Sequence, residues 1–596
     1  MPNRLEPINL IDFTGGLNLR KNQFQLASNE SPEMLNLSID PLGGIYTRRG
    51  WDRWSQNIVA EDTEWDPHRA YLIQFSDGVD MVYVAANNKV FWADPAGTFD
   101  DLGITVGAIP HLADFDAFGD DVYIAAGKTN PTVKRRRAEP PVLLTEAASG
   151  TWNNDYLNPV LGVAPKAEMI EAHAGYLFAG NITEDGAAHP NRLRWSHPTS
   201  PEDWAQSDFI DIDLGGSKIT ALRSYEDHLL IFKNDSVWAL YGYDLDSWQL
   251  VQKSSTIGTP SPQAVTRNEA AVFFYSASDR GGIYAYSGER PVEIGSQLRF
   301  ALESLAAPYH VWVGWIGRKL WVTLPWNYDG PTTTDAGVFV FDPSVSDVGA
   351  WTYFAAKSAM LGPIVAGSNV DSEIRPLGVL RSNQVPCVVR LMSDSEHAAD
   401  SVWDYSVLGY AESLARSSDD LGAIVTDSDP ETGSEIIMNG SSGSEPFDTV
   451  YRTPWITADW PTRKKSFRRP NFICRYTGID HELQVRSYRD YEELNAKRQH
   501  TLTVPAGRIS AAPPEGSPPG QVAAVWNTFN WNDGTLWNQE GETPIVVSPA
   551  KSGASIRRGS SYGLCRSLQL RIKGMTPKAR WGIDAIILKV VMRRFR

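Results

Sequence analysis

The 596-residue sequence has few cysteines, no long apolar run and almost no helical periodicity. Its three cysteines, Cys387, Cys474 and Cys565, are widely spaced and form no Cys-x-x-Cys pair, which argues against a disulfide framework and against a zinc site. We expect them to be small buried side chains. No stretch approaches the about 18 apolar residues that a membrane-spanning helix needs, and the N-terminus lacks the apolar run of a secretory signal. The sequence therefore predicts a chain that folds in a cytoplasm and has no membrane-spanning segment.

Signatures of metal and nucleotide chemistry are missing as well. The ten histidines nowhere form a His-Glu-x-x-His or another metal-ligand spacing, so we expect most of them to be polar loop or surface residues. The sequence contains no phosphate-binding loop. We expect neither a cofactor nor an enzymatic activity, and the sequence predicts no catalytic or metal-binding residue.

Aromatic residues are plentiful, with 21 Trp, 22 Tyr and 21 Phe. They occur in short alternating runs bounded by Gly, Asp, Asn and Pro, which is the pattern of β-strands and tight turns. This pattern predicts an all-β fold. Short helices are predicted only at residues 31–37, where Ser31 and Pro32 form a typical helix start, at 299–305 and at 491–498.

Between residues 65 and 395, pairs of strands recur at an interval of roughly 35 to 50 residues, which is typical of propeller blades. In most of these units an apolar strand is followed by a short polar turn and by a second strand that ends in an aromatic residue. We therefore predict a β-propeller of six or seven blades. The units cover residues 81–95, 120–137, 174–198, 227–242, 270–288 and 318–354, with a weaker one at 375–394.

The rest of the chain divides into three further segments. Residues 1–64 are predicted to dock onto the body of the protein or onto a neighbouring subunit. Residues 396–450 are rich in Ser, Gly, Asp and Glu and are predicted to form an acidic linker, with a long insertion inside one domain as the alternative. From residue 451 to 596 short alternating strands resume, and they predict a basic β-sandwich.

Charge is distributed unevenly along the chain. Residues 451–596 contain 24 Lys and Arg against 11 Asp and Glu, whereas residues 1–450 contain 31 against 60. Such asymmetry indicates a basic face that meets an acidic partner, either nucleic acid or another subunit, and a chance difference between solvated faces is the alternative. We favour subunit docking, because Arg is enriched at protein interfaces. The candidate interface residues are Arg463, Lys464, Lys465, Arg468, Arg469, Arg593, Arg594 and Arg596.

Several phrases of the sequence resemble a known group of proteins. The main phrase, residues 13–51, combines Gly15, Gly16, Leu17 and Asn18 with a later Gly43, Gly44, Arg48 and Arg49. Residues 192–242 and 279–295 form a second stretch of similarity, and WTYF at 351–354 and KKSFRRPNF at 464–472 extend it. On these phrases the chain resembles the nozzle, or tail tubular protein B-like, family of short-tailed bacteriophages.

This resemblance implies a structural protein of the virion tail that is assembled in the host cytoplasm. It implies a homo-oligomer, usually a hexamer, around a central channel beneath the portal and adaptor proteins of the head–tail connector and near the tail fibres or spikes. Such a ring would retain the packaged genome and conduct double-stranded DNA during ejection. A net acidic chain suits a conduit, because each neutralised phosphate adds affinity that would slow a moving duplex.

Two other interpretations stay open. The first is a receptor-binding or glycan-cleaving propeller tail protein, because glycoside hydrolysis needs only two carboxyl groups at a suitable separation. Residues 276–286 resemble the Asp-containing turn of propeller glycosidases, although Asp279 with Arg280 and two glycines is more simply a hairpin turn. The second is a minor tail or hub protein of a long-tailed phage, which would share the same sequence features.

Overall fold

The computed structural model describes residues 5–55, 67–94, 97–107, 113–137, 139–145, 161–198, 200–205, 207–214, 216–244, 246–278, 281–303, 305, 307–324, 337–346, 348–355, 360–366, 376–381, 388–391, 399–400, 424–427, 435–438, 445–446, 448–458, 463–475, 480–504, 554–558, 562–576 and 580–592. These residues form strands β1 to β49, one short α-helix and three 3-10 helices, which confirms the prediction of an all-β fold. In this part of the chain, no helix has the length and apolar character to cross a membrane.

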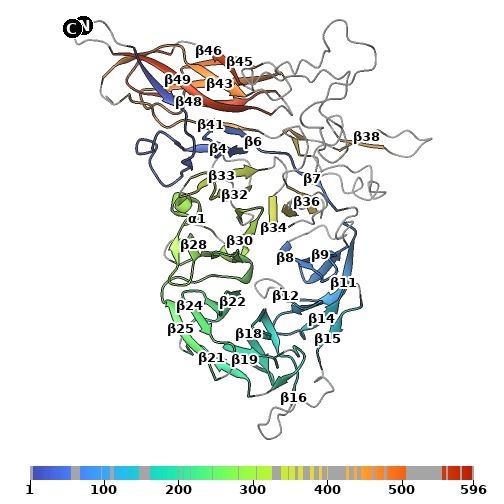
Figure 1. Cartoon of the computed structure of the whole chain (residues 1–596). Coiled ribbons are helices and arrows are strands. Elements are labelled where there is room, and N and C mark those ends of the chain that lie inside the picture. Colours follow the sequence, from blue (N-terminus) through green and yellow to red (C-terminus); the bar gives the residue numbers. More distant parts are fainter. Residues whose placement is uncertain are drawn as a thin grey trace, which may run out of the picture.

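Five four-stranded antiparallel sheets form blades of a β-propeller (Figure 1). The first contains β8 (Pro67–Gln74), β9 (Asp80–Ala86), β10 (Lys89–Ala93) and β11 (Phe99–Thr105). The second contains β12 (Asp114–Phe118), β13 (Asp121–Ala125), β14 (Val133–Arg136) and β15 (Val142–Leu143). The third contains β17 (Lys166–His173), β18 (Tyr176–Glu184), β19 (Ala187–Trp195) and β21 (Phe209–Asp211). The fourth contains β22 (Ile219–Tyr225), β23 (His228–Lys233), β24 (Val237–Tyr241) and β25 (Gln249–Ser254), and the fifth contains β26 (Val265–Arg267), β27 (Val272–Ser276), β28 (Gly282–Tyr286) and β29 (Val292–Glu293).

Tight polar turns and apolar strand faces explain these sheets. In the first sheet, the turn between β9 and β10 places Asn87 at a φ of 54°, a left-handed conformation that Asn tolerates better than most residues. The apolar side chains of each sheet then pack against the next sheet. Phe115 of β12, for example, is fully buried in a cluster with Tyr83 of β9 and Val90 of β10. Similar clusters join the second sheet to the third, the third to the fourth and the fourth to the fifth.

The first strand of each sheet lies nearest the centre of the ring (Figure 1). These first strands contact one another in chain order from β8 through β12, β17 and β22 to β26. Two later strands continue the series: β30 (Trp312–Ile316) contacts β26, and β34 (Met360–Ala366) contacts both β30 and β8. The sheet of β34 also contains β35 (Pro376–Arg381), β36 (Val388–Arg390) and the early strand β7 (Asp52–Arg53).

A nine-stranded sheet connects the propeller to the C-terminal part of the chain. It begins with β30, β31 (Lys319–Thr323), β32 (Gly337–Asp342) and β33 (Ala350–Ala355). It continues through β4 (Glu33–Leu35) to β41 (Val450–Arg452), β48 (Leu568–Gly574), β44 (His481–Arg489) and β45 (Arg498–Val504). The N-terminal strand β4 therefore lies between β33 and the C-terminal strand β41.

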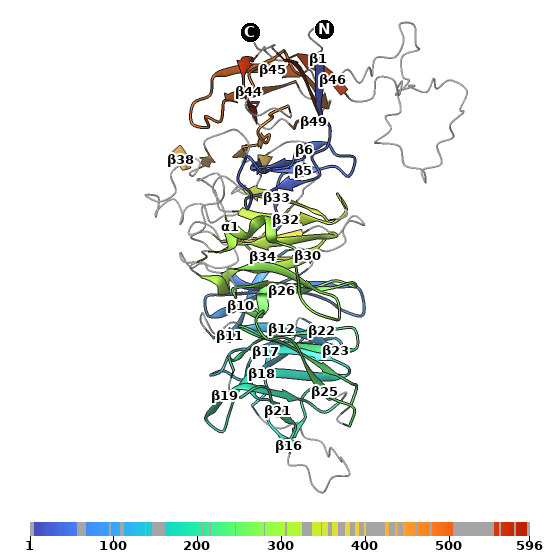
Figure 2. The same ribbon diagram turned by 90° about the vertical axis from the view of Figure 1, so that its left-hand side faces the viewer.

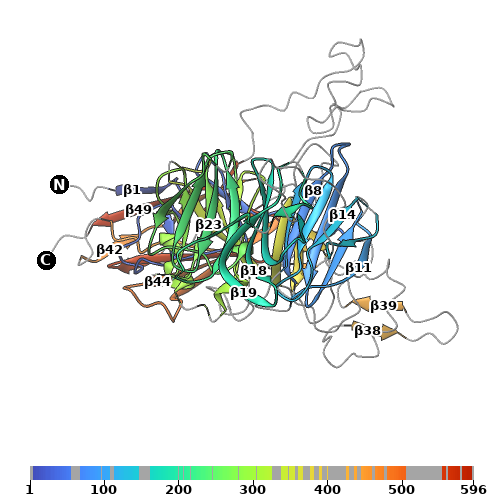
Figure 3. The same ribbon diagram turned by 90° about the horizontal axis from the view of Figure 1, so that it is seen from below.

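An eight-stranded sheet holds both ends of the described chain. Its path is β46 (Ala554–Arg558), β43 (Asn471–Arg475), β49 (Gly582–Met592), β42 (Lys465–Phe467) and β47 (Gly563–Cys565), and β1 (Leu5–Leu10), β5 (Leu37–Ile39) and β6 (Ile45–Thr47) join it. β1 and β49 run side by side in antiparallel register, with Ile8 opposite Leu588 (Figure 2, Figure 3). This sheet and the C-terminal half of the nine-stranded sheet contribute to one hydrophobic cluster.

Four small sheets complete the described strands. β2 (Gly16–Leu17) pairs with β3 (Glu30–Ser31), β16 (Leu161–Gly162) with β20 (Trp204–Ala205), β37 (Ala399–Asp400) with β40 (Glu445–Pro446), and β38 (Ile424–Asp427) with β39 (Glu435–Met438). Most of the predicted linker at 396–450 lies outside the described residues.

Two of the three predicted helices are wrong. Residues 31–37 belong to β3, β4 and β5, because Asn36 has a φ of 55° and interrupts any helix between Leu35 and Leu37. Residues 491–498 form turns and the start of β45. At 299–305 the structure has one short helix, α1 (Arg299–Leu302), preceded by the 3-10 helix Ser296–Leu298. The other 3-10 helices are Pro262–Ala264 and Pro308–His310.

Candidate functional site: the axial channel

The axis of the propeller is crossed by a buried arginine. Arg69 of β8 is 5% exposed, and its guanidinium group donates a 2.8 Å hydrogen bond to Asp114 on β12. The same group donates a 3.4 Å bond to the carbonyl of Pro262, which precedes β26. Arg69 belongs to the first sheet, Asp114 to the second, and Pro262 to the 3-10 helix that precedes the fifth, so the side chain of Arg69 forms a bar across the channel.

Carboxyl groups on the first strands join neighbouring sheets. The carboxylate of Asp116 on β12 accepts a hydrogen bond from the amide of Ala172 on β17 at 2.5 Å. Glu171 of β17 likewise accepts one from the amide of Ser224 on β22 at 2.8 Å, and it also accepts one from the guanidinium group of Arg223 at 3.0 Å. These side-chain bonds tie the first strands together where no backbone ladder connects them.

Burial changes the protonation of these carboxyl groups. It raises the pKa of Glu171 to about 7, against the opposing effect of the Arg223 charge. Burial also raises the pKa of Asp116, although the amides of Ala172 and Ala117 lower it. The channel therefore contains carboxyl groups that take up a proton more readily than exposed ones.

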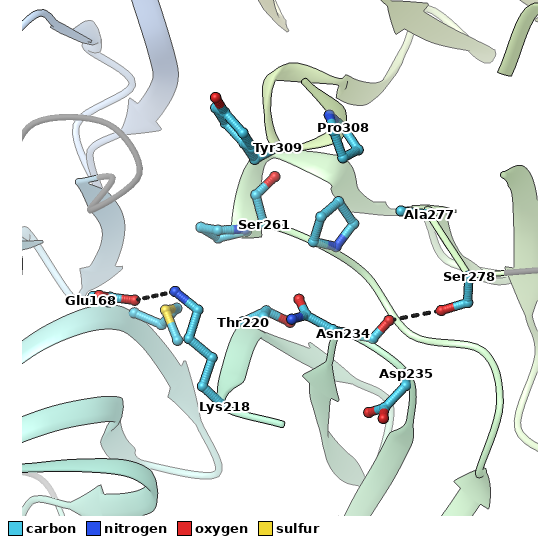
Figure 4. A pocket seen from close by; sticks show the side chains of 13 residues that line it. Glu168, Lys218, Thr220, Asn234, Asp235, Ser261, Ala277, Ser278, Pro308 and Tyr309 are labelled. Carbon is cyan, nitrogen blue, oxygen red and sulfur yellow. Dashed lines mark hydrogen bonds and ion pairs between the residues drawn. The ribbon is translucent and has the colours of Figure 1, made fainter. Parts of the chain in front are cut away.

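A first axial cavity of about 480 Å³ is lined by residues of the third, fourth and fifth sheets and of the segments that adjoin them (Figure 4). Glu168 and Lys218 face each other in it at 3.4 Å, and Glu168 also pairs with Lys128 at 3.3 Å. The hydroxyl of Ser261 lines this cavity, is buried and has no hydrogen-bond partner. Other lining residues are Met169, Thr220, Asn234, Asp235, Pro260, Pro262, Ala277, Ser278, Pro308 and Tyr309.

A second axial cavity of about 240 Å³ lies beside the Arg69 bar. Arg69 lines this cavity and Pro262 lines the first one, so the hydrogen bond between these two residues marks the boundary between the two cavities. The second cavity combines cationic and aromatic walls. Its lining includes Arg69, Tyr71, Arg223, Thr266, Arg267, Trp312 and Trp315.

The histidines differ from the prediction. His68, His173, His228 and His481 are buried, and none of the other described histidines is fully exposed. His173, His228, His310 and His500 lie against aromatic rings. The Nε2 atom of His228 also shares a 3.2 Å hydrogen bond with the hydroxyl of Tyr286. Burial lowers the pKa of His173 to about 4. In the described part of the chain, no group of three or more His, Cys, Asp or Glu residues could hold a metal ion.

The predicted interface residues lie in different environments. Arg463 and Lys464, before β42, and Arg468 and Arg469, after it, are exposed. Lys465 is instead fully buried. Its ammonium group donates hydrogen bonds to the carbonyls of Thr457 and Arg566, the latter at 3.0 Å, and these bonds compensate for the loss of water. Lys465 is therefore a structural residue within the subunit and does not belong to an exposed basic surface. Arg593, Arg594 and Arg596 lie outside the described residues.

Several other sequence-predicted features can be located. Cys474 and Cys565 are free and buried, as predicted, and burial raises the pKa of both thiols to about 12. Cys387, Asp279 and Arg280 lie outside the described residues. Residues 559–563 also have the Gly-x-Ser-x-Gly spacing of hydrolase nucleophile turns. The strand β47 that follows is not the helix that such a turn requires.

The sequence basis of the channel was also missed. Asp116, Glu171 and Arg223 each lie two residues before the end of a first strand, at Phe118, His173 and Tyr225 respectively. The recurrence of a charged residue at the same position in three successive units is a signal that could have indicated the axial cluster.

Comparisons with known proteins give a remote likeness of shape only. Neither a protein-family model nor a curated protein matches the chain. Virginiamycin B lyase from Staphylococcus aureus is 13% identical at a TM-score of 0.36, covering 56% of this chain and 97% of that one. A streptogramin B lyase structure is 13% identical at a TM-score of 0.36, covering 58% of this chain and 98% of that one. The Pan2 WD40 domain of Neurospora crassa is 7% identical at a TM-score of 0.35, covering 59% of this chain and 96% of that one. Likenesses at this level carry no argument about function.

Proposed function

We propose that the chain is a structural, non-enzymatic subunit of a bacteriophage tail, similar to a nozzle protein. In this proposal several copies, six in the family that it resembles, form a ring that extends the portal–adaptor channel, retains the packaged genome and conducts DNA during ejection. DNA would pass between subunits along the ring axis, because Arg69 crosses the propeller axis of each subunit.

The observation that carries this proposal is the nine-stranded sheet. It runs from β30 through the N-terminal strand β4 to the C-terminal strand β45 as one series of hydrogen-bonded neighbours. A subunit that lines a conduit must keep its parts in fixed relative positions, and a shared hydrogen-bonded sheet provides that rigidity. β4 also lies inside residues 13–51, the main phrase of the resemblance.

We further infer that the propeller has seven blades. The sixth would be β30–β33, and the seventh would be β34–β36 completed by β7. The contacts of β34 with both β30 and β8 support this count, because they would close the ring of first strands. A strand from the N-terminal segment would then complete the last blade, a common way to close a propeller against opening.

We also propose that the C-terminal strands form a β-sandwich. The eight-stranded sheet and the strands β41, β48, β44 and β45 would be its two layers. In support, Phe472 of β43 and Leu570 of β48, which belong to the two different sheets, are fully buried in the same hydrophobic cluster. The exposed Arg463, Lys464, Arg468 and Arg469 would lie on its surface and contact a neighbouring subunit or the adaptor.

The ring is tested by imaging the purified full chain at increasing concentration by negative-stain electron microscopy. We expect closed rings with an open axial channel wide enough for duplex DNA. A variant with Arg463, Lys464, Arg468 and Arg469 changed to Glu should lose the rings. A control variant with Arg290→Glu and Arg318→Glu, which reverses exposed charges on the propeller, should keep them.

Two results would contradict the proposal. One is a chain that stays monomeric at all concentrations, both alone and with portal and adaptor proteins. The other is a monomer that releases sugar from a glycan, which would favour the glycan-cleaving interpretation.

A further inference from the structure

The second axial cavity is lined by arginine side chains, and the carboxylates that pair with two of them lie outside its lining. Arg69 on β8, Arg223 on β22 and Arg267 on β26 all line it, and its described lining contains no Asp or Glu. The nearby carboxylates of Asp116 and Glu171 accept hydrogen bonds from backbone amides of the next sheet, at Ala172 and Ser224 respectively. The charged side chains in the lining itself are therefore all cationic, and the carboxylates that balance them lie behind the lining.

Two N–H groups at this cavity have no acceptor. The Nε–H of Arg69 and the Nε–H of Arg223 are buried from water and make no hydrogen bond. Another nitrogen of each guanidinium group already forms an ion pair. Arg69 pairs with Asp114 at 2.8 Å, and Arg223 pairs with Glu171 at 3.0 Å. An unpaired buried N–H of a charged group costs about 1–3 kcal/mol or more. Both N–H groups are covered by protein atoms, so an anion in the cavity accepts from them only after a small movement of the two side chains.

We propose that the second axial cavity binds a small oxyanion, a carboxylate or a phosphate, through Arg69, Arg223 and Arg267. A guanidinium group matches the geometry of such oxygens and can bond to two of them at once. The side chain of Arg267 is exposed, so the site is open to solvent and a free anion can reach it.

The size and the walls of the cavity limit the ligand. Its volume of about 240 Å³ is below the range of about 300–1,000 Å³ that is typical of drug-sized ligands, so the anion has few heavy atoms. Trp312 and Trp315 contribute aromatic surface to the lining. Trp315 is held by stacking on Phe273, with ring centroids 5.0 Å apart, and its indole can report binding through fluorescence.

Proton uptake should accompany binding. The three lining arginines are balanced by Asp114, Asp116 and Glu171, so a bound anion adds uncompensated negative charge. Glu171 can take up a proton, because burial raises its pKa to about 7. The titratable or charged groups around it are Arg69 and Tyr71 from β8, Asp114 and Asp116 from β12, His173 from β17, Arg223 from β22 and Arg267 from β26. Affinity should therefore rise as the pH falls from 8 to 6.

The test is a titration of the full chain with inorganic phosphate and, separately, with acetate at constant ionic strength. Calorimetry and tryptophan fluorescence are the two readouts. We expect saturable binding to a single site for at least one anion, and the preferred anion identifies the ligand class. Arg267→Gln should weaken that binding about tenfold, which is the loss of one charge-assisted hydrogen bond.

Two further variants separate a specific effect from misfolding. Arg290→Gln removes an equally exposed arginine that lines neither cavity and should bind as the wild type does. Arg69→Met with Asp114→Asn removes the buried pair together, so that no charge is left unpaired, and should also abolish binding. The inference is overturned if millimolar phosphate and acetate both fail to bind. It is equally overturned if Arg267→Gln and Arg290→Gln have the same effect.

Discussion

Replacing Glu33 with Gln tests whether charge holds the N-terminal strand β4 in the nine-stranded sheet. Glu33 lies opposite Arg452 of β41, which lies opposite Arg571 of β48, so one acid faces two arginines across three adjacent strands. The carboxylate of Glu33 accepts hydrogen bonds from Arg571 at 2.6 and 3.0 Å, and Arg452 lies 4.0 Å away. The substitution keeps the shape of the side chain and leaves two adjacent arginines without an anion.

The expected loss follows from the burial of this group. Hydrogen bonds to charged groups contribute about 1.5–3 kcal/mol, and breaking a buried pair costs about 3–5 kcal/mol. The side chains of Glu33 and Arg571 are 14% and 24% exposed, so solvent screens the pair in part. We therefore expect Glu33→Gln to lower the free energy of unfolding of this sheet by about 2 kcal/mol.

Urea titration with hydrogen exchange at residues 33–35 and 450–452 measures this change. The matched control is Glu482→Gln on β44, an exposed glutamate of the same sheet that should shift stability by less than about 0.5 kcal/mol. A double-mutant cycle with Arg571→Met should give a coupling of about 1–2 kcal/mol. Equal effects of Glu33→Gln and Glu482→Gln would refute the reasoning.

Three further predictions concern buried groups. Tyr451→Phe should stabilise the protein by about 1 kcal/mol in urea unfolding, because the hydroxyl of this fully buried residue has no hydrogen-bond partner. Tyr286→Phe should instead destabilise the protein, because the Tyr286 hydroxyl donates a hydrogen bond to the carbonyl of Gly288 at 2.9 Å. The reverse order of the two stabilities would contradict this reasoning. Because the pKa of Glu171 is raised to about 7, its contribution to stability is complete below its unfolded-state pKa and is lost as the pH rises through about 7. The wild type should therefore lose stability relative to Glu171→Gln between pH 5 and 8. A difference in stability that does not change with pH would show that the pKa of Glu171 is ordinary. In a Cys387→Ser background, Cys474 and Cys565 should react with a thiol reagent at pH 8 only after unfolding, because burial raises the pKa of both thiols to about 12. Rapid labelling of the native protein would disprove their burial.

The hairpins of the propeller were predictable because their signal is local. The alternation in residues 81–95, for instance, predicts the pair β9 and β10, and the turn residue Asn87 has the conformation that its chemistry favours. Local patterns of this kind need no knowledge of distant partners, so they are visible in one sequence.

The N-terminal segment was not predictable in the same way. Ser31 and Pro32 have the local pattern of a helix start, but Leu35 lies opposite both Tyr353 and Val450, and these partners are more than 300 residues away in the chain. Tertiary pairing overrides local propensity here, and the left-handed backbone at Asn36 is stabilised by its bond to Arg48 at 2.8 Å.

The axial channel was hidden for a different reason. Arg69, Glu171 and Arg223 occupy positions in alternating strands where a charged residue normally points to solvent. Only the closure of the sheets around one axis buries them. For the same reason Lys465 was grouped with its exposed neighbours, although its two carbonyl acceptors come from positions 457 and 566.

The pairing of β1 with β49 has a consequence for how the protein is made. β1 ends at Leu10 and β49 begins at Gly582, so at a synthesis rate of about 5–20 residues per second the first strand waits about half a minute to two minutes for its partner to leave the ribosome. During that time its backbone groups are unpaired and can be bound by chaperones or by another nascent chain. A chain that ends before residue 582 would leave β1 without this partner strand.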